Sequence, residues 1–251
     1  MILRRLTANL RAQNWTAIGI EFLIVVLGVF IGTQVSNWNV ARGERHENMQ
    51  VLRGLKPELE NLIENFKTLT EYYGVTRNYA DTAFAGWRGD AKASDRDFAI
   101  AAYQASQNTF TGINNSSWSQ IFGSDRLRSL EDQELRDELA VLMTTDFAAM
   151  EKELFSDYRQ NVRKVIPEDV QDAIRAQCGD QRVALGYIRL LPTCSVALPD
   201  ERFRAAAKEL RARPELAGEM RWHFAAAASY VDNIENLERL ARRVVARIDK
   251  I

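Results

Sequence analysis

The stretch from Ala17 to Val35 reads AIGIEFLIVVLGVFIGTQV and is apolar except at Glu21, Thr33 and Gln34. As a helix it is apolar on all sides, whereas the surface helix of a soluble protein has only one apolar stripe. The hydrocarbon core of a bilayer is spanned by about 20 residues of helix, so the length fits. The sequence therefore predicts a membrane-spanning helix, and the lipid bilayer is the first partner that it implies.

Two tryptophans bracket this stretch. Trp15 and Trp38 are separated by ~34 Å at a helical rise of about 1.5 Å per residue, close to one hydrocarbon thickness with its interfaces. Tryptophan prefers that interface. The alternative is a cleaved secretory signal, but no A-x-A-like site follows and residues 34–39 are bulky and polar. We expect an uncleaved anchor over residues 16–38 after a tail over residues 1–15.

One face of the predicted membrane helix carries small and polar residues. At about 100° per residue, Gly28 and Gly32 flank the direction of Glu21, and Asn39 is in line with it. The glycines form a G-x-x-x-G motif, which lets two helices approach closely in lipid, and Glu21 should be protonated or paired there. The stripe predicts contact with a second copy or with another membrane helix. In the alternative reading the glycines face lipid and Glu21 reaches the interface.

The orientation of the helix is nearly undecided by positive charge. Three arginines precede the helix and three follow it within about 20 residues: Arg4, Arg5, Arg11 and then Arg42, Arg45, Arg53. The short basic tail favours an N-terminus inside, which gives an inner-membrane protein with a periplasmic domain if the source is a Gram-negative bacterium. In that compartment a disulfide between Cys178 and Cys194 is expected.

The same N-terminal residues resemble a known family. Ile18–Gly32, followed by Ser36-Asn37-Trp38-Asn39, is similar to the signature of an uncharacterised family of bacterial single-pass membrane proteins. Ile20 lies between the glycine and the glutamate, and Ser36 stands where asparagine is usual in that family. A weaker likeness covers Ser117–Leu127. The resemblance implies a membrane location and a helical domain outside the membrane, and it carries over no catalytic residue.

The rest of the chain predicts helices. Only 5 Pro and 13 Gly occur among 251 residues, and 46% of the residues are hydrophobic, which favours a globular helical domain. A juxtamembrane segment over residues 39–56, with a hinge near Gly54–Lys56, should lead into a domain over residues 57–251. A 3-4-3-4 seam begins there: Leu52, Leu55, Leu59, Leu62, Phe66, Leu69, Tyr73, Thr76, Ala80, Ala83 and Trp87.

Further helices are expected after this seam. Ser94 should cap a short helix that ends near Ser106, a long helix should cover residues 130–165, Asp200 should cap the next helix, and Pro214 should open the last one. A small β-hairpin is possible near residues 180–195. We predict a mainly all-α fold, with one membrane helix followed by an antiparallel bundle. The seam could instead form a coiled coil between two chains.

Few residues point to chemistry. The net charge of −1 indicates no nucleic-acid partner. We find no P-loop, dinucleotide fingerprint, HExxH, GxSxG or CxxC motif, and only His46 and His223 could supply imidazole, so no cofactor or metal site is predicted. The acids of residues 131–138 are read as a helix start. The basic C-terminal end is read as a solvated face or as a contact with anionic lipid: Arg239, Arg242, Arg243, Arg247 and Lys250.

Two functional classes stay open. The favoured one is a non-enzymatic, membrane-anchored interaction or sensory module that self-associates through the Glu21 stripe. The alternative is a membrane-tethered enzyme whose site lies in the polar loops around Asn114–Trp118 or Gly179–Pro192.

Overall fold

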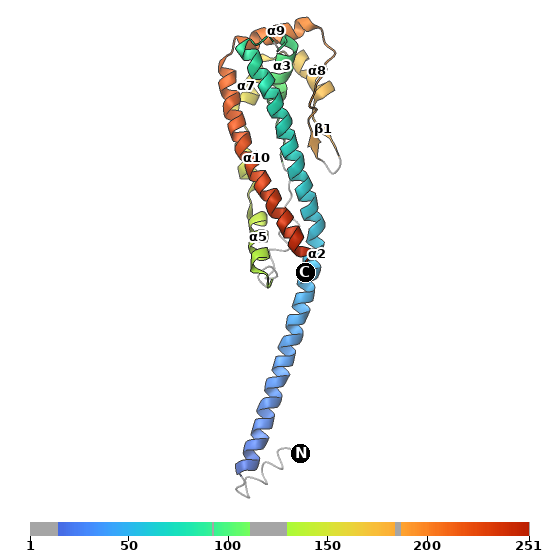
Figure 1. The fold of residues 1–251 in the computed structure, drawn as a ribbon, viewed down its shortest axis with the longest axis vertical. Coiled ribbons are helices and arrows are strands. Elements are labelled where there is room, and N and C mark those ends of the chain that lie inside the picture. Colours follow the sequence, from blue (N-terminus) through green and yellow to red (C-terminus); the bar gives the residue numbers. More distant parts are fainter. Residues whose placement is uncertain (1–14, 92, 111–129, 184–186, 251) are drawn as a thin grey trace.

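One helix runs through most of the length of the molecule (Figure 1). The computed structural model describes residues 15–91, 93–110, 130–183 and 187–250. Helix α2 (Trp15–Arg88) has 74 residues, or about 110 Å at 1.5 Å per residue. Apart from one two-stranded ribbon, the regular structure in the described ranges is helical, with eight helices. The all-α fold is therefore confirmed.

Helix α2 has two halves with different surroundings. Its N-terminal half projects alone from the rest of the chain (Figure 1), and the large apolar side chains between Trp15 and Val40 are exposed. From Leu52 onward one side of the helix is buried in every turn. The predicted seam is buried at each position up to Ala83, and Trp87 is partly buried against the same core.

The seam forms the core of a single chain. Helix α10 (Glu215–Ile248) packs along α2, and α3 (Asp95–Gln104) and α9 (Asp200–Arg211) cover its far end (Figure 1). The two long helices are antiparallel, as predicted, and the C-terminal end of α10 lies beside the middle of α2. Lys56 Nζ is 2.6 Å from Asp249 Oδ1 at this end.

The hinge predicted near Gly54–Lys56 is absent, because α2 continues through Pro57 without a break. Proline removes one helical hydrogen bond and crowds the preceding turn. Here Arg53, Gly54 and Pro57 all lie on the exposed side of α2, where water can solvate the freed carbonyl. Leu55 and Leu59, on the other side, are 2% and 0% exposed, so core packing holds the helix on both sides of the proline.

The single helix predicted over residues 130–165 is wrong. Three helices occupy this range: α5 (Gln133–Thr144), α6 (Phe147–Lys152) and α7 (Asp157–Val165). Asp146 ends the first run because its carboxylate accepts a hydrogen bond from the Ala149 amide at 3.0 Å and caps α6. The periodic apolar residues of this range are nevertheless the buried ones, from Leu135 through Phe147 to Val162.

The remaining predictions concern local structure. Ser94 caps α3 as expected, accepting from the Asp97 amide. Strands β1 (Gln181–Arg182) and β2 (Ile188–Arg189) form the predicted antiparallel hairpin after α8 (Glu168–Cys178). Asp200 is the first residue of α9 rather than its cap, a position that Pro199 takes. The Asp200 carboxylate instead accepts a hydrogen bond from Arg96 Nε at 2.8 Å.

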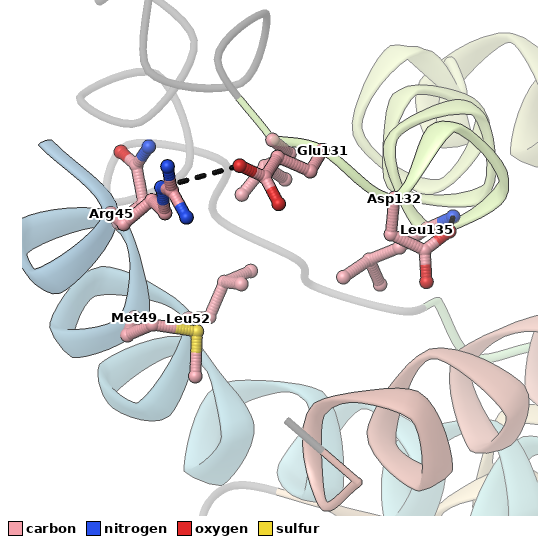
Figure 2. A pocket seen from close by; sticks show the side chains of 8 residues that line it. Arg45, Met49, Leu52, Glu131, Asp132 and Leu135 are labelled. Carbon is pink, nitrogen blue, oxygen red and sulfur yellow. Dashed lines mark hydrogen bonds and ion pairs between the residues drawn. The ribbon is translucent and has the colours of Figure 1, made fainter. Parts of the chain in front are cut away.

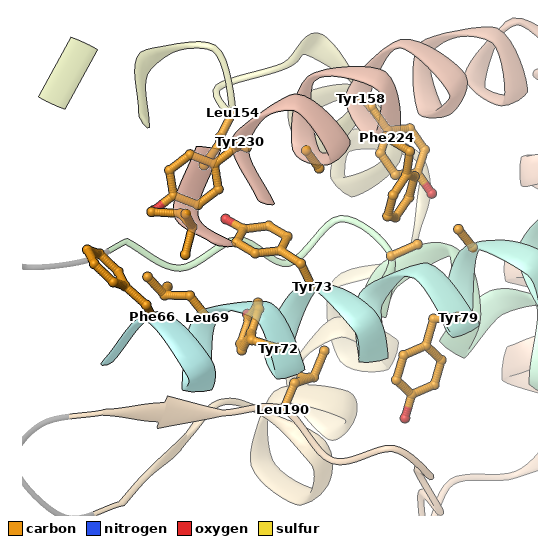
Figure 3. Packing of buried hydrophobic residues seen from close by; sticks show 14 of the residues in the cluster. Phe66, Leu69, Tyr72, Tyr73, Tyr79, Leu154, Tyr158, Leu190, Phe224 and Tyr230 are labelled. Carbon is orange, nitrogen blue, oxygen red and sulfur yellow. The ribbon is translucent and has the colours of Figure 1, made fainter. Parts of the chain in front are cut away.

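Tyrosines form a large part of the core beside α10. Figure 3 shows Tyr73 of α2 lying between Tyr72 and Tyr230, with both pairs of rings in edge contact at 5.6 Å between centroids. Each ring brings a hydroxyl that needs a partner when buried. Tyr73 donates to the Thr109 carbonyl at 2.7 Å and Tyr79 donates to the Leu191 carbonyl at 2.8 Å. These bonds attach irregular segments of the chain to α2.

The crossing of α2 and α3 gives a matched pair of glycine substitutions. A Cβ at Gly86 would lie 2.1 Å from the Phe98 ring, whereas a Cβ at Gly74 of the same helix meets nothing within 4 Å. Gly86→Ala should lower the free energy of unfolding by about 1–3 kcal/mol through overpacking. Gly74→Ala should raise it by up to about 1 kcal/mol through helix propensity. Urea unfolding in mild detergent measures both, and equal effects would contradict the described crossing.

Candidate functional site

The apolar N-terminal part of α2 is the largest uncovered apolar surface among the described residues. Only one helix in the described ranges is long and apolar enough to cross a membrane, and none of its most apolar window is buried. Trp15 and Trp38 are 73% and 57% exposed at the ends of this segment. Such a surface is unfavourable in water and favourable in the hydrocarbon core of a bilayer.

The predicted stripe lies open on this segment. A Cβ added at Gly28 or Gly32 would meet nothing within 4 Å, and Asn39 is exposed. Glu21 is half-buried, and one of its carboxylate oxygens has no hydrogen-bond partner among the described residues. The structure contains one chain, so the contact with a second helix stays a prediction.

The same face of α2 continues beyond the apolar segment. At about 100° per residue, Gly43, His46 and Gln50 fall within 40° of Glu21. All three are exposed, and His46 Nε2 lies 3.1 Å from Gln50 Nε2. Asn48, on the opposite side of the helix, is buried against the domain, with 7% of its surface exposed. The small and polar stripe therefore faces away from the domain along its whole length.

The two cysteines are paired. Cys178 at the end of α8 forms a disulfide with Cys194, across the β-hairpin. The Cys178 carbonyl also accepts a hydrogen bond from Gln104 Nε2 at 2.8 Å, which ties this corner to α3. Closing a loop of this size stabilises the folded chain by about 3 kcal/mol in the chain-entropy description. This bears out the predicted pairing and leaves the compartment to be established.

Two charge clusters that the sequence analysis treated separately meet at the end of the domain nearer the apolar segment. Arg243 Nε lies 2.7 Å from Glu138 Oε1, and Arg247 is paired with Asp132, Glu134 and Glu138. The hydrogen bond from the Leu135 amide and the charge of Arg247 lower the pKa of Asp132. Arg239 and Arg242 pair with acids of their own helix. The basic end of α10 thus binds carboxylates, which favours the reading as a solvated face over lipid contact.

A cavity of about 390 Å³ lies beside these clusters, between α2 and the start of α5 (Figure 2). Its floor is apolar, and Arg45 and Glu131 form an ion pair of 3.3 Å at its rim. Sequence reasoning missed it, because its two walls are at least 78 residues apart in the chain. The lining residues are Arg45, Asn48, Met49, Leu52, Leu130, Glu131, Asp132 and Leu135.

His223 belongs to the core. It is 0% exposed, and its Nδ1 lies 2.8 Å from Ser156 Oγ, while its Nε2 has no hydrogen-bond partner among the described residues. Burial, and secondarily the charge of Arg159, lowers the pKa of His223 from 6.5 to about 4. No group of three potential metal ligands occurs in the described ranges. The imidazole is therefore a neutral core group near neutral pH.

Of the two loops named as alternative enzyme sites, one falls outside the described residues. This is Asn114–Trp118, where a short helix over Trp118–Phe122 is also expected from the sequence; in Gly179–Pro192 only residues 184–186 fall outside. Comparison of the chain with models of protein families, with curated proteins and with solved structures finds no match.

The buried imidazole predicts a pH dependence of stability. Between pH 6.5 and about 4 the unfolded chain binds a proton at His223 that the folded chain does not, so the free energy of unfolding falls with pH by about 3 kcal/mol over this window. His223→Gln should remove this slope. His46→Gln, in the exposed part of α2, is the control. Urea titrations at pH 7.5, 6, 5 and 4 measure the difference, and a slope unchanged in His223→Gln would refute the assignment.

Proposed function

We propose that this chain is a membrane-anchored, non-enzymatic interaction or sensory module that works as an assembly of two or more copies. The observation that carries the proposal is the uncovered apolar segment of α2, which is continuous with the helix that forms the spine of the domain core. A soluble protein would cover a surface of this size with other elements of its core. The resemblance of Ile18–Gly32 and Ser36–Asn39 to a single-pass membrane family supports the same reading.

The domain lies on the outer side of the inner membrane in this proposal. Supporting it are the disulfide between Cys178 and Cys194, since disulfides persist in oxidising compartments, and the short basic tail before the helix. The domain begins where α2 first buries side chains, at Asn48 and Leu52. About 10 residues of exposed helix, or ~15 Å, separate Trp38 from that point.

Self-association is assigned to the open stripe of Glu21, Gly28, Gly32 and Asn39. The glycines allow two backbones to approach, and the carboxyl group of Glu21, one oxygen of which is buried without a partner among the described residues, can form a hydrogen bond across the contact once its side chain turns toward the second helix. The stripe faces away from the domain, so two copies can align their helices without a clash between their own domains near the membrane.

Membrane location and side are tested together in cells. The full-length chain should stay with the membrane after carbonate extraction. A thiol introduced by Trp222→Cys, at a position 71% exposed, should react in intact spheroplasts with a maleimide that cannot cross the membrane. Thr7→Cys in the tail is the control and should react only after permeabilisation. A shorter chain that starts after Trp38 would exclude the anchor, and the reverse labelling pattern would place the domain inside.

The stripe is tested by a matched pair of substitutions in the membrane segment. Gly28→Ile should weaken self-association by about 1–3 kcal/mol, because lipid cannot replace the lost packing between helices. Leu23→Ile lies about 160° from Glu21 around the helix and should have no effect. Glu21→Gln should be milder than Glu21→Leu, since the amide keeps a donor and an acceptor. Cross-linking and a membrane two-hybrid reporter measure association; similar behaviour of Gly28→Ile and Leu23→Ile would mean that the stripe faces lipid.

A further inference from the structure

The cavity between α2 and α5 has the composition of a small-molecule site. Ligand pockets are typically about 300–1,000 Å³, with mostly apolar walls and a few placed polar groups. This one is about 390 Å³. Leu52 and Leu135 are 4% and 0% exposed in its floor, and Met49 and Leu130 are partly buried beside them. An apolar body of a ligand would cover the exposed parts of Met49 and Leu130 and remove them from water.

The charged groups at the rim retain unused bonding capacity. The ion pair joins Arg45 Nε to Glu131 Oε1 at 3.3 Å. It involves one nitrogen of Arg45 and one oxygen of Glu131, so the terminal nitrogens of the guanidinium and the second carboxylate oxygen can contact a ligand. Both side chains are exposed, by 59% and 74%, and they project over the cavity in Figure 2. One guanidinium and one carboxylate are thus available within one small space.

The other charges near the cavity are already occupied. The Asp132 carboxylate accepts from the Leu135 amide at 3.0 Å, which also satisfies the positive end of helix α5. Its other oxygen lies 3.4 Å from Arg247 Nη1. Neither a simple anion nor a simple cation would use both rim groups. A molecule with one positive and one negative group would engage Arg45 and Glu131 together.

We propose that this cavity binds a small zwitterion with an apolar body, the chemical class of a free α-amino acid with a large apolar side chain. The ligand carboxylate pairs with the free edge of Arg45, a geometry that guanidinium favours. The ammonium group pairs with Glu131, and the apolar side chain lies on Met49 and Leu130. Binding replaces one exposed ion pair by two that are partly desolvated, which strengthens each of them.

The site is independent of the proposed self-association. At about 100° per residue, Asn48 and Leu52 lie about 140–180° around α2 from Glu21, and Arg45 lies about 120° from it. A ligand here contacts the helix that leads to the membrane and the start of α5 at once. Its binding can therefore be measured without reference to whether the stripe pairs two chains, and either proposal can fail alone.

The test uses three soluble probes with the same aromatic body. L-phenylalanine carries both charges, 2-phenylethylammonium only the positive one, and 3-phenylpropionate only the negative one. With the full chain in lipid nanodiscs and empty nanodiscs as reference, calorimetric titration should show saturable binding of phenylalanine. Each analogue should bind about tenfold more weakly or worse, the factor expected for one lost hydrogen bond to a charged group. Glycine, which lacks the apolar body, should not bind measurably.

Variants assign the two charges. Arg45→Gln should make phenylalanine and 2-phenylethylammonium bind alike, because the partner of the carboxylate is gone. Glu131→Gln should do the same for phenylalanine and 3-phenylpropionate. Arg53→Gln and Glu47→Gln, exposed on the same helix outside the cavity, should leave all affinities unchanged. No saturable binding of phenylalanine, equal affinity of the three probes for the unaltered chain, or control variants as damaging as the two rim variants would each overturn the proposal.

Discussion

The structure depends on one continuous helix, α2, whose ladder of backbone hydrogen bonds resumes beyond the single bond lost at Pro57. In a bilayer the peptide groups must bond to one another, so a segment that spans by itself has to be helical. Here the ladder does not stop where the apolar segment ends but continues for 50 residues beyond Trp38, to Arg88. Residues 17–35 of the helix are apolar on all sides, and the part from Leu52 onward is apolar on one side only. The rest of the domain is arranged around this second part.

At the end of the domain nearer the apolar segment, charge pairs surround a limited apolar core. The start of α5 carries Asp132, Glu134 and Glu138, the end of α10 carries Arg243 and Arg247, and Lys56 pairs with Asp249. Exposed pairs of this kind contribute little individually, about 0–1 kcal/mol. Glu138 is the exception in exposure, with 11% of its side chain accessible and two arginines beside it. This end therefore offers groups that a ligand or salt can compete for, unlike the aromatic core farther up.

Much of the fold could be predicted from local signals in the sequence, and the errors have physical causes. The seam from Leu52 to Trp87 has the helical period over a long range, so packing and pattern agree. The hinge was wrong because Pro57 lies on the exposed side, which a sequence alone does not reveal. The helix breaks before Phe147 and Asp157 were missed because the apolar period continues through them while Asp146 caps a new turn. The position of this helix break is therefore set by local hydrogen bonding and not by the apolar period.

The candidate sites also differ in whether the sequence alone could predict them. The anchor and its stripe are local along one helix, so sequence periodicity was enough to define them. The cavity and the pairing of residues 132–138 with residues 243–247 join parts of the chain that are at least 78 residues apart, and hydrophobic periodicity does not reveal contacts over such a distance. The only available signal was compositional: an acidic helix start and a basic helix end of opposite charge.

Because α2 has no break, a tilt of its N-terminal segment moves the far end of the domain. In the proposed arrangement the far end of the helix, at Arg88, is 50 residues or about 75 Å from the bilayer surface at Trp38. Membrane helices tilt to match bilayer thickness, by about 0–40°. A change in tilt of about 10° would move the far end of the domain sideways by about 13 Å, since no hinge exists along α2 to absorb it. A change in bilayer thickness or in helix pairing would then change the distance between neighbouring domains.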